Sequence, residues 1–167
     1  VNKSPFERIT LLYTGEDASI AAARSGQAQI AVVTPSVAGT IPAGMERLVV
    51  QSVDNRGILF PMQPAGRKTA DGQPIGNDVT ADPAIRQAIN IAIDRKKLTE
   101  GVLGGYGTPA WGVADGLPWD NPEQRLPDSD IEGAKAILKQ AGWVEKDGKL
   151  SKHGKPARFS MLHPAND

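Results

Sequence analysis

Two histidines, His153 and His163, are the side chains best suited to chemistry in this 167-residue sequence, because a neutral imidazole can bind a metal ion or accept a proton. They form neither the H-x-x-x-H nor the H-E-x-x-H pattern of a zinc site, and the sequence has no cysteine. His153 lies in a charged, glycine-flanked stretch and is predicted to be solvated. His163 ends a predicted strand, where α/β folds often place ligand-contacting groups. We therefore predict no metal site and keep His163 as a candidate ligand contact.

Charged residues near the middle of the chain could form an acid–base set. Arg86 and Asp94 are spaced so that they share one helix face, and Arg95 follows directly. We predict structural ion pairing or a solvated face, because no nucleophile with a base and an orienting partner accompanies them. No serine lies in a G-x-S-x-G turn. The sequence therefore predicts a protein that is not an enzyme.

One glycine-rich segment, residues 105–110, has the G-x-G-x-x-A spacing of a dinucleotide-binding loop. Phosphate binding there requires a preceding strand and a following helix N-terminus. A predicted helix precedes this segment, and Pro109 interrupts any helix that would begin after it. We predict a structural turn and expect no cofactor.

Composition narrows the class of protein. Lys plus Arg and Asp plus Glu number 19 each, so the formal net charge is zero, whereas a nucleic-acid-binding protein needs a basic excess. No apolar run approaches the length required to cross a bilayer. Residues 1–6 lack the pattern of a signal peptide. Because residues 158–167 run from a predicted strand into a loop, we expect the chain to be part of a longer polypeptide.

The elements that must position these side chains alternate between strands and helices, which predicts an α/β fold. A βαβ unit with a right-handed crossover is expected first, with its helix over residues 18–25 and Gly26 ending it. An exposed loop or small hairpin is expected over residues 64–79, and a second exposed hairpin over 146–156. The predicted strands cover residues 9–13, 30–33, 47–53, 57–60 and 157–162.

Two further helices carry clear start signals. One begins at Asp82-Pro83, with an N-cap followed by a proline that the first helical position tolerates, and its segment ends at glycines 101–105. The other begins near residue 129 or 130, since either Ser129, in a capping box, or Asp130 could cap it. Gly142 is expected to end it. The predicted buried stripes are Ile85, Ala88, Ile89, Ala92 and Ile93 in the first helix and Ile131, Ala134, Leu138 and Ala141 in the second.

Three ordered motifs resemble the family 5 extracellular solute-binding proteins of the peptide/nickel class. Residues 83–98 (PAIRQAINIAIDRKKL) resemble the family's R-Q-A segment leading into A-I-D-R-x-x-L. Residues 104–110 (GGYGTPA) look like the turn after that helix, and 134–143 (AKAILKQAGW) look like the next helix. Upstream, Arg24-Ser-Gly26 with Ile30-Ala31 is similar to the family's S-G-x-x-D-I segment, although Gln29 stands where the family has Asp.

The resemblance implies part of a periplasmic binding protein type II-like fold, with residues 1–167 as a single partial domain of the second of two lobes. Residues 64–79 would be an insertion. The function implied is that of the substrate-binding component of an ABC importer, located in the periplasm or otherwise outside the cytoplasm and monomeric at full length. Its partners would be permease subunits and a peptide, opine or nickel-chelate solute. The family's main ligand-anchoring elements would lie beyond Asp167, so the solute stays unassigned.

In such a fold, loops at strand ends line the ligand cleft. The candidate ligand-binding residues are Thr34, Pro35, Ser36, Met62, Gln63 and His163. A ligand-sensing domain of a regulator built on the same fold is the alternative function. A helix-turn-helix before Val1 would favour that alternative, and a secretion signal would favour transport.

Overall fold

The best-defined helix begins where the sequence predicts. The computed structural model describes residues 3–50 and 52–163. Helix α3 (Pro83–Ala92) starts after Asp82, whose carboxylate accepts a hydrogen bond from the Ala84 N–H at 2.9 Å. It ends at Ala92, earlier than predicted, because Ile93 is extended (ψ 131°). Helix α4 (Arg95–Leu103) follows the break and stops before Gly104 and Gly105, both at positive φ.

Helix α5 (Ile131–Gln140) resolves the choice between two capping residues. Asp130 accepts a hydrogen bond from the Gly133 N–H at 2.8 Å, so Asp130 is the N-cap. Ser129 instead adopts a left-handed conformation (φ 59°). Gly142, with φ 84°, ends the helix as predicted. The expected burial of Ile131 is wrong, because this first-turn side chain is 49% exposed.

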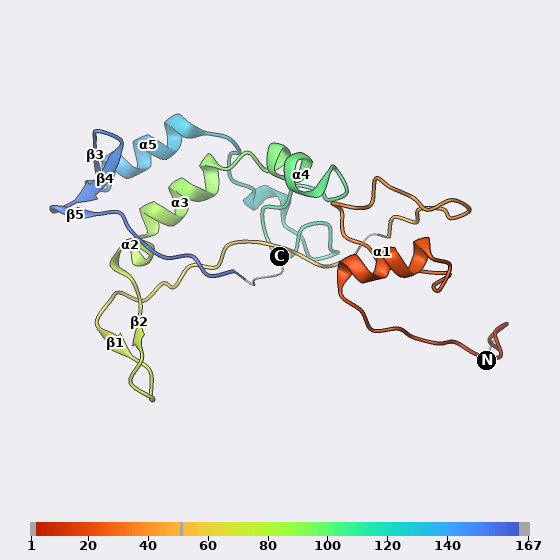
Figure 1. Cartoon of the computed structure of the whole chain (residues 1–167). Helices are drawn as coiled ribbons and strands as arrows, with labels where there is room; N and C mark the ends of the chain where they lie inside the picture. The colour runs from red at the N-terminus through yellow and green to blue at the C-terminus, as the bar shows by residue number, and fades with distance from the viewer. Residues whose placement is uncertain (1–2, 51, 164–167) are drawn as a thin grey trace. The chain divides into compact units, whose positions relative to one another are not determined.

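Helices α3 and α5 lie side by side and share the core (Figure 1). Small side chains at the contact, Ala88 and Ala134, are both buried together with Ile91. A second cluster joins Val79, Ile85 and Trp143, so Trp143 has the packing role expected of a large aromatic side chain. The apolar stripe of α3 thus packs into the core as its periodicity predicts. Ala84 and Ile91 are buried in addition, whereas Ile93, which was expected in the stripe, lies just after the helix and is half-buried.

The sheets of the described residues are small and antiparallel. Strands β1 and β2 form a hairpin inside residues 64–79, and strands β3, β4 and β5 form a three-stranded meander at the second predicted hairpin. The meander's turns carry pairs of positive-φ residues, Asp147-Gly148 and His153-Gly154, as tight hairpins require. The strands are β1 (Arg67–Lys68), β2 (Pro74–Ile75), β3 (Val144–Lys146), β4 (Lys149–Lys152) and β5 (Lys155–Pro156); the remaining helices are α1 (Glu16–Arg24), α2 (Asp78–Ala81) and the 3-10 helix Pro122–Gln124.

The predicted βαβ unit and its parallel strands are wrong for the described residues. Helix α1 forms, and Gly26 ends it with φ 74°, but the flanking segments 9–13 and 30–33 are extended chain without strand partners. The described parts of 47–53, 57–60 and 158–162 likewise have no strand partner, and Gln51 lies outside the described residues. Ala157 differs, because its N–H donates to the Leu150 carbonyl of β4 at 2.8 Å. A strand exists only when a neighbour accepts its backbone hydrogen bonds, and sequence patterning does not supply that neighbour.

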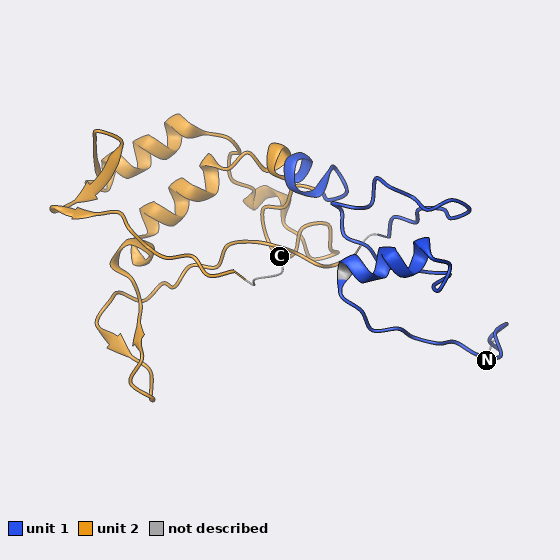
Figure 2. Ribbon diagram, viewed as in Figure 1, with its two compact units in different colours: residues 1–51, 99–107 blue, residues 52–98, 108–167 orange. Residues whose placement is uncertain are grey.

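The chain divides into two compact units (Figure 2). Unit 1 comprises residues 1–51 and 99–107, and unit 2 comprises residues 52–98 and 108–167. Unit 2 contains both hairpin systems and the α3–α5 core, whereas unit 1 contains α1. No helix in the described part of the chain is both long and apolar enough to cross a membrane.

Candidate functional site

Met62 and Gln63 lie where an extended segment meets the base of the β1–β2 hairpin in unit 2. Gln63 is held at both ends, since its carbonyl accepts from the Asn77 N–H at 2.9 Å and its side-chain oxygen accepts from Arg67 Nη1 at 2.7 Å. Just upstream, the Thr80 hydroxyl donates to the Pro61 carbonyl at 3.0 Å. Met62 is 71% exposed. This candidate segment therefore has a defined path despite its exposure.

Asn77 links this segment to the one that carries His163. Its side-chain oxygen caps α2 by accepting from the Val79 and Thr80 N–H groups, and its amide nitrogen donates to the Arg158 carbonyl at 3.4 Å. Sequence reasoning missed Asn77, although an asparagine just before a short helix is an N-cap signal. An open pocket of about 500 Å³ lies here, lined by Asn77, Ala157, Arg158, Phe159 and Ser160.

The two segments also meet through their aromatic side chains. The rings of Phe60 and Phe159 are 6.3 Å apart in an edge-to-face arrangement. His163 is exposed, lies further along the same extended chain as Phe159, and is not among the residues that line the pocket. The structure thus places Gln63 and the chain leading to His163 on either side of Asn77.

The third candidate segment, Thr34 to Ser36, belongs to unit 1 and forms a turn. The Val37 and Ala38 N–H groups both donate to the Thr34 carbonyl, at 3.2 and 3.1 Å. The Thr34 and Ser36 hydroxyls are 2.9 Å apart and hydrogen bonded. Thr34 and Pro35 are half-buried and Ser36 is exposed, so Ser36 is the most accessible of the three.

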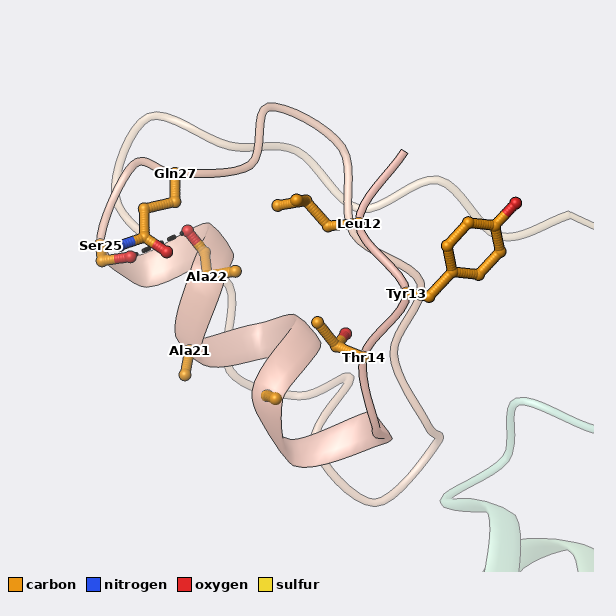
Figure 3. A pocket seen from close by; sticks show the side chains of 8 residues that line it. Leu12, Tyr13, Thr14, Ala21, Ala22, Ser25 and Gln27 are labelled. Carbon is orange, nitrogen blue, oxygen red and sulfur yellow. Dashed lines mark hydrogen bonds between the residues drawn. The ribbon is translucent and has the colours of Figure 1, made fainter. Parts of the chain in front are cut away.

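Unit 1 also contains a pocket that the sequence did not predict (Figure 3). It has a volume of about 540 Å³ between α1 and the extended segment around Tyr13, which is 92% exposed. Helix α1 contributes mainly alanines to its lining. The lining residues are Leu12, Tyr13, Thr14, Ala18, Ala21, Ala22, Ser25 and Gln27.

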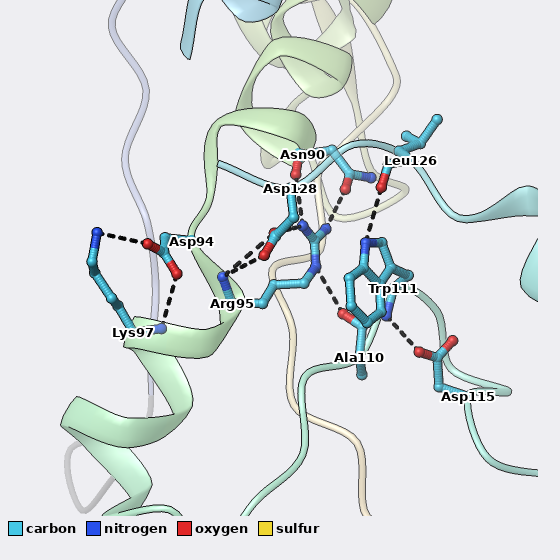
Figure 4. A network of polar contacts seen from close by, with 9 residues as sticks. All are labelled: Asn90, Asp94, Arg95, Lys97, Ala110, Trp111, Asp115, Leu126 and Asp128. Atoms are coloured by element: carbon cyan, nitrogen blue, oxygen red, sulfur yellow. Dashed lines mark hydrogen bonds and ion pairs between the residues drawn. The ribbon is translucent and has the colours of Figure 1, made fainter. Parts of the chain in front are cut away.

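Arg95 organises a polar network around the break between α3 and α4 (Figure 4). Its side chain, 10% exposed, donates to Asp128 at 2.6 Å, to the Ala110 carbonyl at 2.9 Å and to the Asn90 carbonyl at 3.0 Å, and also to the Asn90 side-chain oxygen. Its guanidinium lies 5.4 Å from the centre of the Trp111 ring. Structural ion pairing is therefore confirmed for Arg95.

The other residues of the suspected acid–base set are structural as well. Arg86 donates to the carbonyls of Thr80 and Ala81 at 2.7 and 2.9 Å, so it caps α2 and does not pair with Asp94. Asp94 pairs with Lys97 at 2.8 Å, and that hydrogen bond lowers the pKa of Asp94. These contacts give Arg86 and Asp94 structural partners within the described part of the chain.

Asp82 connects two of the sequence motifs. Besides capping α3, its carboxylate accepts from Lys152 at 2.8 Å and from the Trp143 indole at 3.1 Å. Burial raises the pKa of Asp82, but the hydrogen bonds from Lys152, the Ala84 N–H and Trp143 outweigh it, so the pKa lies below its ordinary value. This arrangement stabilises the ionised carboxylate and fixes β4 and α5 against α3.

The remaining chemical motifs are also structural. The glycine-rich segment follows α4 as a turn, and a Cβ on Gly107 would lie 2.4 Å from the Leu103 side chain. This confirms the predicted turn. His153 is exposed in the β4–β5 turn. Across residues 3–50 and 52–163, no group of three or more His, Asp or Glu residues could hold a metal ion.

Comparison with known proteins identifies the class. A family model described as bacterial extracellular solute-binding proteins, family 5 Middle, matches residues 2–167. The chain belongs to this family, which implies a fold of the periplasmic binding protein type II kind; within it, the described residues form a mixed arrangement of helices and small sheets.

The chain is also similar in sequence to three individual proteins. Protein XP55 of Streptomyces lividans is 31% identical over 99% of this chain and 29% of its own length. The oligopeptide-binding protein AppA of Bacillus subtilis is 33% identical, and the nickel-binding periplasmic protein of Escherichia coli is 36% identical. These two matches cover 51% and 53% of this chain and 17% of each relative. The chain thus spans less than a third of the length of these relatives.

Proposed function

We propose that the protein is the substrate-binding component of an ABC importer for peptides or nickel complexes, acting outside the cytoplasm as a monomer and delivering its solute to permease subunits. The observation that carries this proposal is the family match over residues 2–167, together with relatives named for oligopeptide and for nickel binding. The comparisons lend no support to a regulator's sensing domain. An enzyme would need a nucleophile or an acid–base set, and the charged groups around Arg86, Asp94 and Arg95 act as scaffold.

The exposure of many apolar side chains supports the proposal that this chain is part of a larger lobe. Leu59 is 95% exposed and Leu162 is 96% exposed, and in unit 1 Ile30 and Val32 exceed 85%. In the described chain, residues 9–13, 30–33, 57–60 and 159–162 form no backbone–backbone hydrogen bonds. Large exposed apolar patches are rare on monomeric proteins and often mark a surface that another segment or partner covers. We propose that these segments become strands in the full-length protein by pairing with other parts of the polypeptide.

Binding would proceed by closure of two lobes around the solute. A solute that contacts both lobes shifts a pre-existing equilibrium between open and closed forms by its differential affinity for the closed form. This stretch would supply Thr34, Pro35, Ser36, Met62, Gln63 and His163 to the cleft. The permease would then recognise the closed form.

Matched substitutions in the full-length protein test these residues. Gln63→Ala and His163→Asn should weaken solute binding without changing the unfolding midpoint. Gln124→Ala and His153→Asn make the same chemical changes at exposed positions outside the candidate site, and should leave affinity unchanged. Isothermal titration calorimetry with a panel of short peptides and a nickel complex measures the affinities. Equal affinities across all four variants and the wild type would remove Gln63 and His163 from the site.

A further inference from the structure

The side chain of Gln63 has a fixed orientation although it is exposed. Arg67, at the start of β1, donates from Nη1 to Gln63 Oε1 at 2.7 Å. A guanidinium carries only donors, so the oxygen end of the amide must face Arg67. The Gln63 amide nitrogen therefore faces away, and its two N–H donors have no partner among the residues that the structure describes.

The backbone around Gln63 is fixed just as closely. Gly76 has φ +85°, and a Cβ at this position would lie 2.1 Å from the Pro64 carbonyl oxygen and 2.6 Å from that of Gln63. Only glycine permits this approach, which brings the Asn77 N–H to the Gln63 carbonyl at 2.9 Å. The hairpin thus folds back onto residues 63 and 64 and holds Arg67 beside Gln63.

The carboxylate of Asp78, at the base of this hairpin, already has partners. Asp78 accepts from the Ala65 N–H at 3.0 Å and lies 3.6 Å from the Lys155 ammonium. Gln63 and Arg67 together offer the amide N–H groups of one residue and the positive guanidinium of the other. An arrangement of donors with a positive charge favours an ionised carboxylate over an ammonium or a neutral group.

We propose that Gln63 and Arg67 form a carboxylate-binding pair, with the β1–β2 hairpin as its positioning element. The inference rests on the proposed solute-binding function and specifies the part of the solute that this segment recognises. Both proposed solute classes can supply the group, a peptide through its free C-terminus and a nickel complex through a carboxylate chelator. Gln63 supplies N–H donors to one carboxylate oxygen, and Arg67 supplies charge and further donors.

The chain offers a matched control for Arg67. Lys68 follows it in β1, so the two side chains leave the strand on opposite faces. Arg67→Met and Lys68→Met each remove one positive charge from an exposed strand position. Gln63→Glu keeps the size of the side chain but replaces its N–H donors by an acceptor.

The experiment uses the full-length protein and three probes: trialanine with a free C-terminus, the same peptide as its C-terminal amide, and the nickel complex of histidine. For a probe with a free carboxylate, Arg67→Met and Gln63→Glu should each weaken binding by about 10- to 100-fold, as expected for a lost charge-assisted hydrogen bond. Arg67→Met should also remove the preference for the free acid over the amide. Lys68→Met should retain wild-type affinities, and all variants should keep the wild-type thermal midpoint.

Two outcomes separate the inference from the function on which it rests. If the wild-type protein binds a carboxylate probe and Arg67→Met binds it as tightly as Lys68→Met does, the pair is refuted while the solute-binding function stands. If the wild-type protein binds none of the three probes, the peptide and nickel function fails, and the carboxylate pair fails with it.

Discussion

Replacing Arg95 by methionine should destabilise unit 2 by about 3 kcal/mol. The substitution leaves Asp128 without its ionic partner and removes the donors that reach the Ala110 and Asn90 carbonyls. Breaking a buried ion pair from one side costs about 3–5 kcal/mol. The lower end applies because the Asp128 side chain is 26% exposed and keeps some hydration. Lys97→Met breaks a pair whose lysine is 82% exposed and should leave stability unchanged.

Native-state hydrogen exchange in the full-length protein locates this effect. The segment after Asp128 is attached to the end of α3, because the Ser129 N–H donates to the Ile93 carbonyl at 3.0 Å and the Asp130 N–H donates to the Ile91 carbonyl at 2.8 Å. Loss of about 3 kcal/mol corresponds to about 100-fold faster exchange at these amides. Exchange in Arg95→Met that matches exchange in Lys97→Met would refute the role given to this network.

Three further predictions concern full-length variants. Gly76→Ala should lower the free energy of unfolding by about 2–4 kcal/mol in urea titrations, because the added Cβ would collide with the Pro64 carbonyl. The control Gly72→Ala has the same φ of 85° but no atom of the described residues near the added Cβ, and should lower it by about 1 kcal/mol. Equal losses in the two variants would contradict the close approach at Gly76. Asp82 has a lowered folded-state pKa, so its stabilisation is present above the unfolded pKa near 3.8 and is lost as the pH falls through the lower folded value. Thermal midpoints of Asp82→Asn should therefore fall less steeply than those of the wild type between about pH 5 and about pH 3, and parallel curves would contradict this. Leu59→Lys should destabilise the protein by about 3 kcal/mol in urea titrations if other strands cover this position, and no loss would refute that covering.

The starts of α3 and α5 and the end of α5 could be predicted because their signals are local. Asp82 and Asp130 accept hydrogen bonds from N–H groups two or three residues away, and Gly142 adopts the left-handed conformation that its type permits. The end of α3 was not predicted, although Asp94, whose carboxylate accepts from the Lys97 N–H at 2.9 Å, is a local N-cap signal for α4. The Ile93 carbonyl is satisfied by the Ser129 N–H, and nothing near Ile93 in the sequence indicates that distant partner.

The strand predictions were wrong because strand pairing depends on distant parts of the chain, which local signals do not reveal. Residues 57–60 have the apolar, β-prone composition of a buried strand, yet that composition says only that the segment suits a sheet. Pairing depends on a neighbouring strand, and the described residues place none beside it. The small hairpins could be predicted because their turn residues, such as Asp147 and Gly148, lie between strands that are adjacent in the sequence.

The candidate site was partly accessible from sequence. The strand-end rule selected Gln63 and His163, and the structure connects their segments through Asn77. The rule could not indicate Arg67, because its bond to Gln63 depends on how Gly76 lets the hairpin fold back. Close approach of two backbones is a tertiary property that a single glycine in a sequence does not reveal.

The solute retained by the full-length protein through purification tests the central claim most directly. The protein would be denatured, and the released small molecules and nickel would be measured by mass spectrometry against the protein concentration. Our account predicts about one peptide or one nickel complex per chain at saturation, released chemically unchanged. A protein that carries and binds neither of them, or that converts a bound solute into a product, would contradict it.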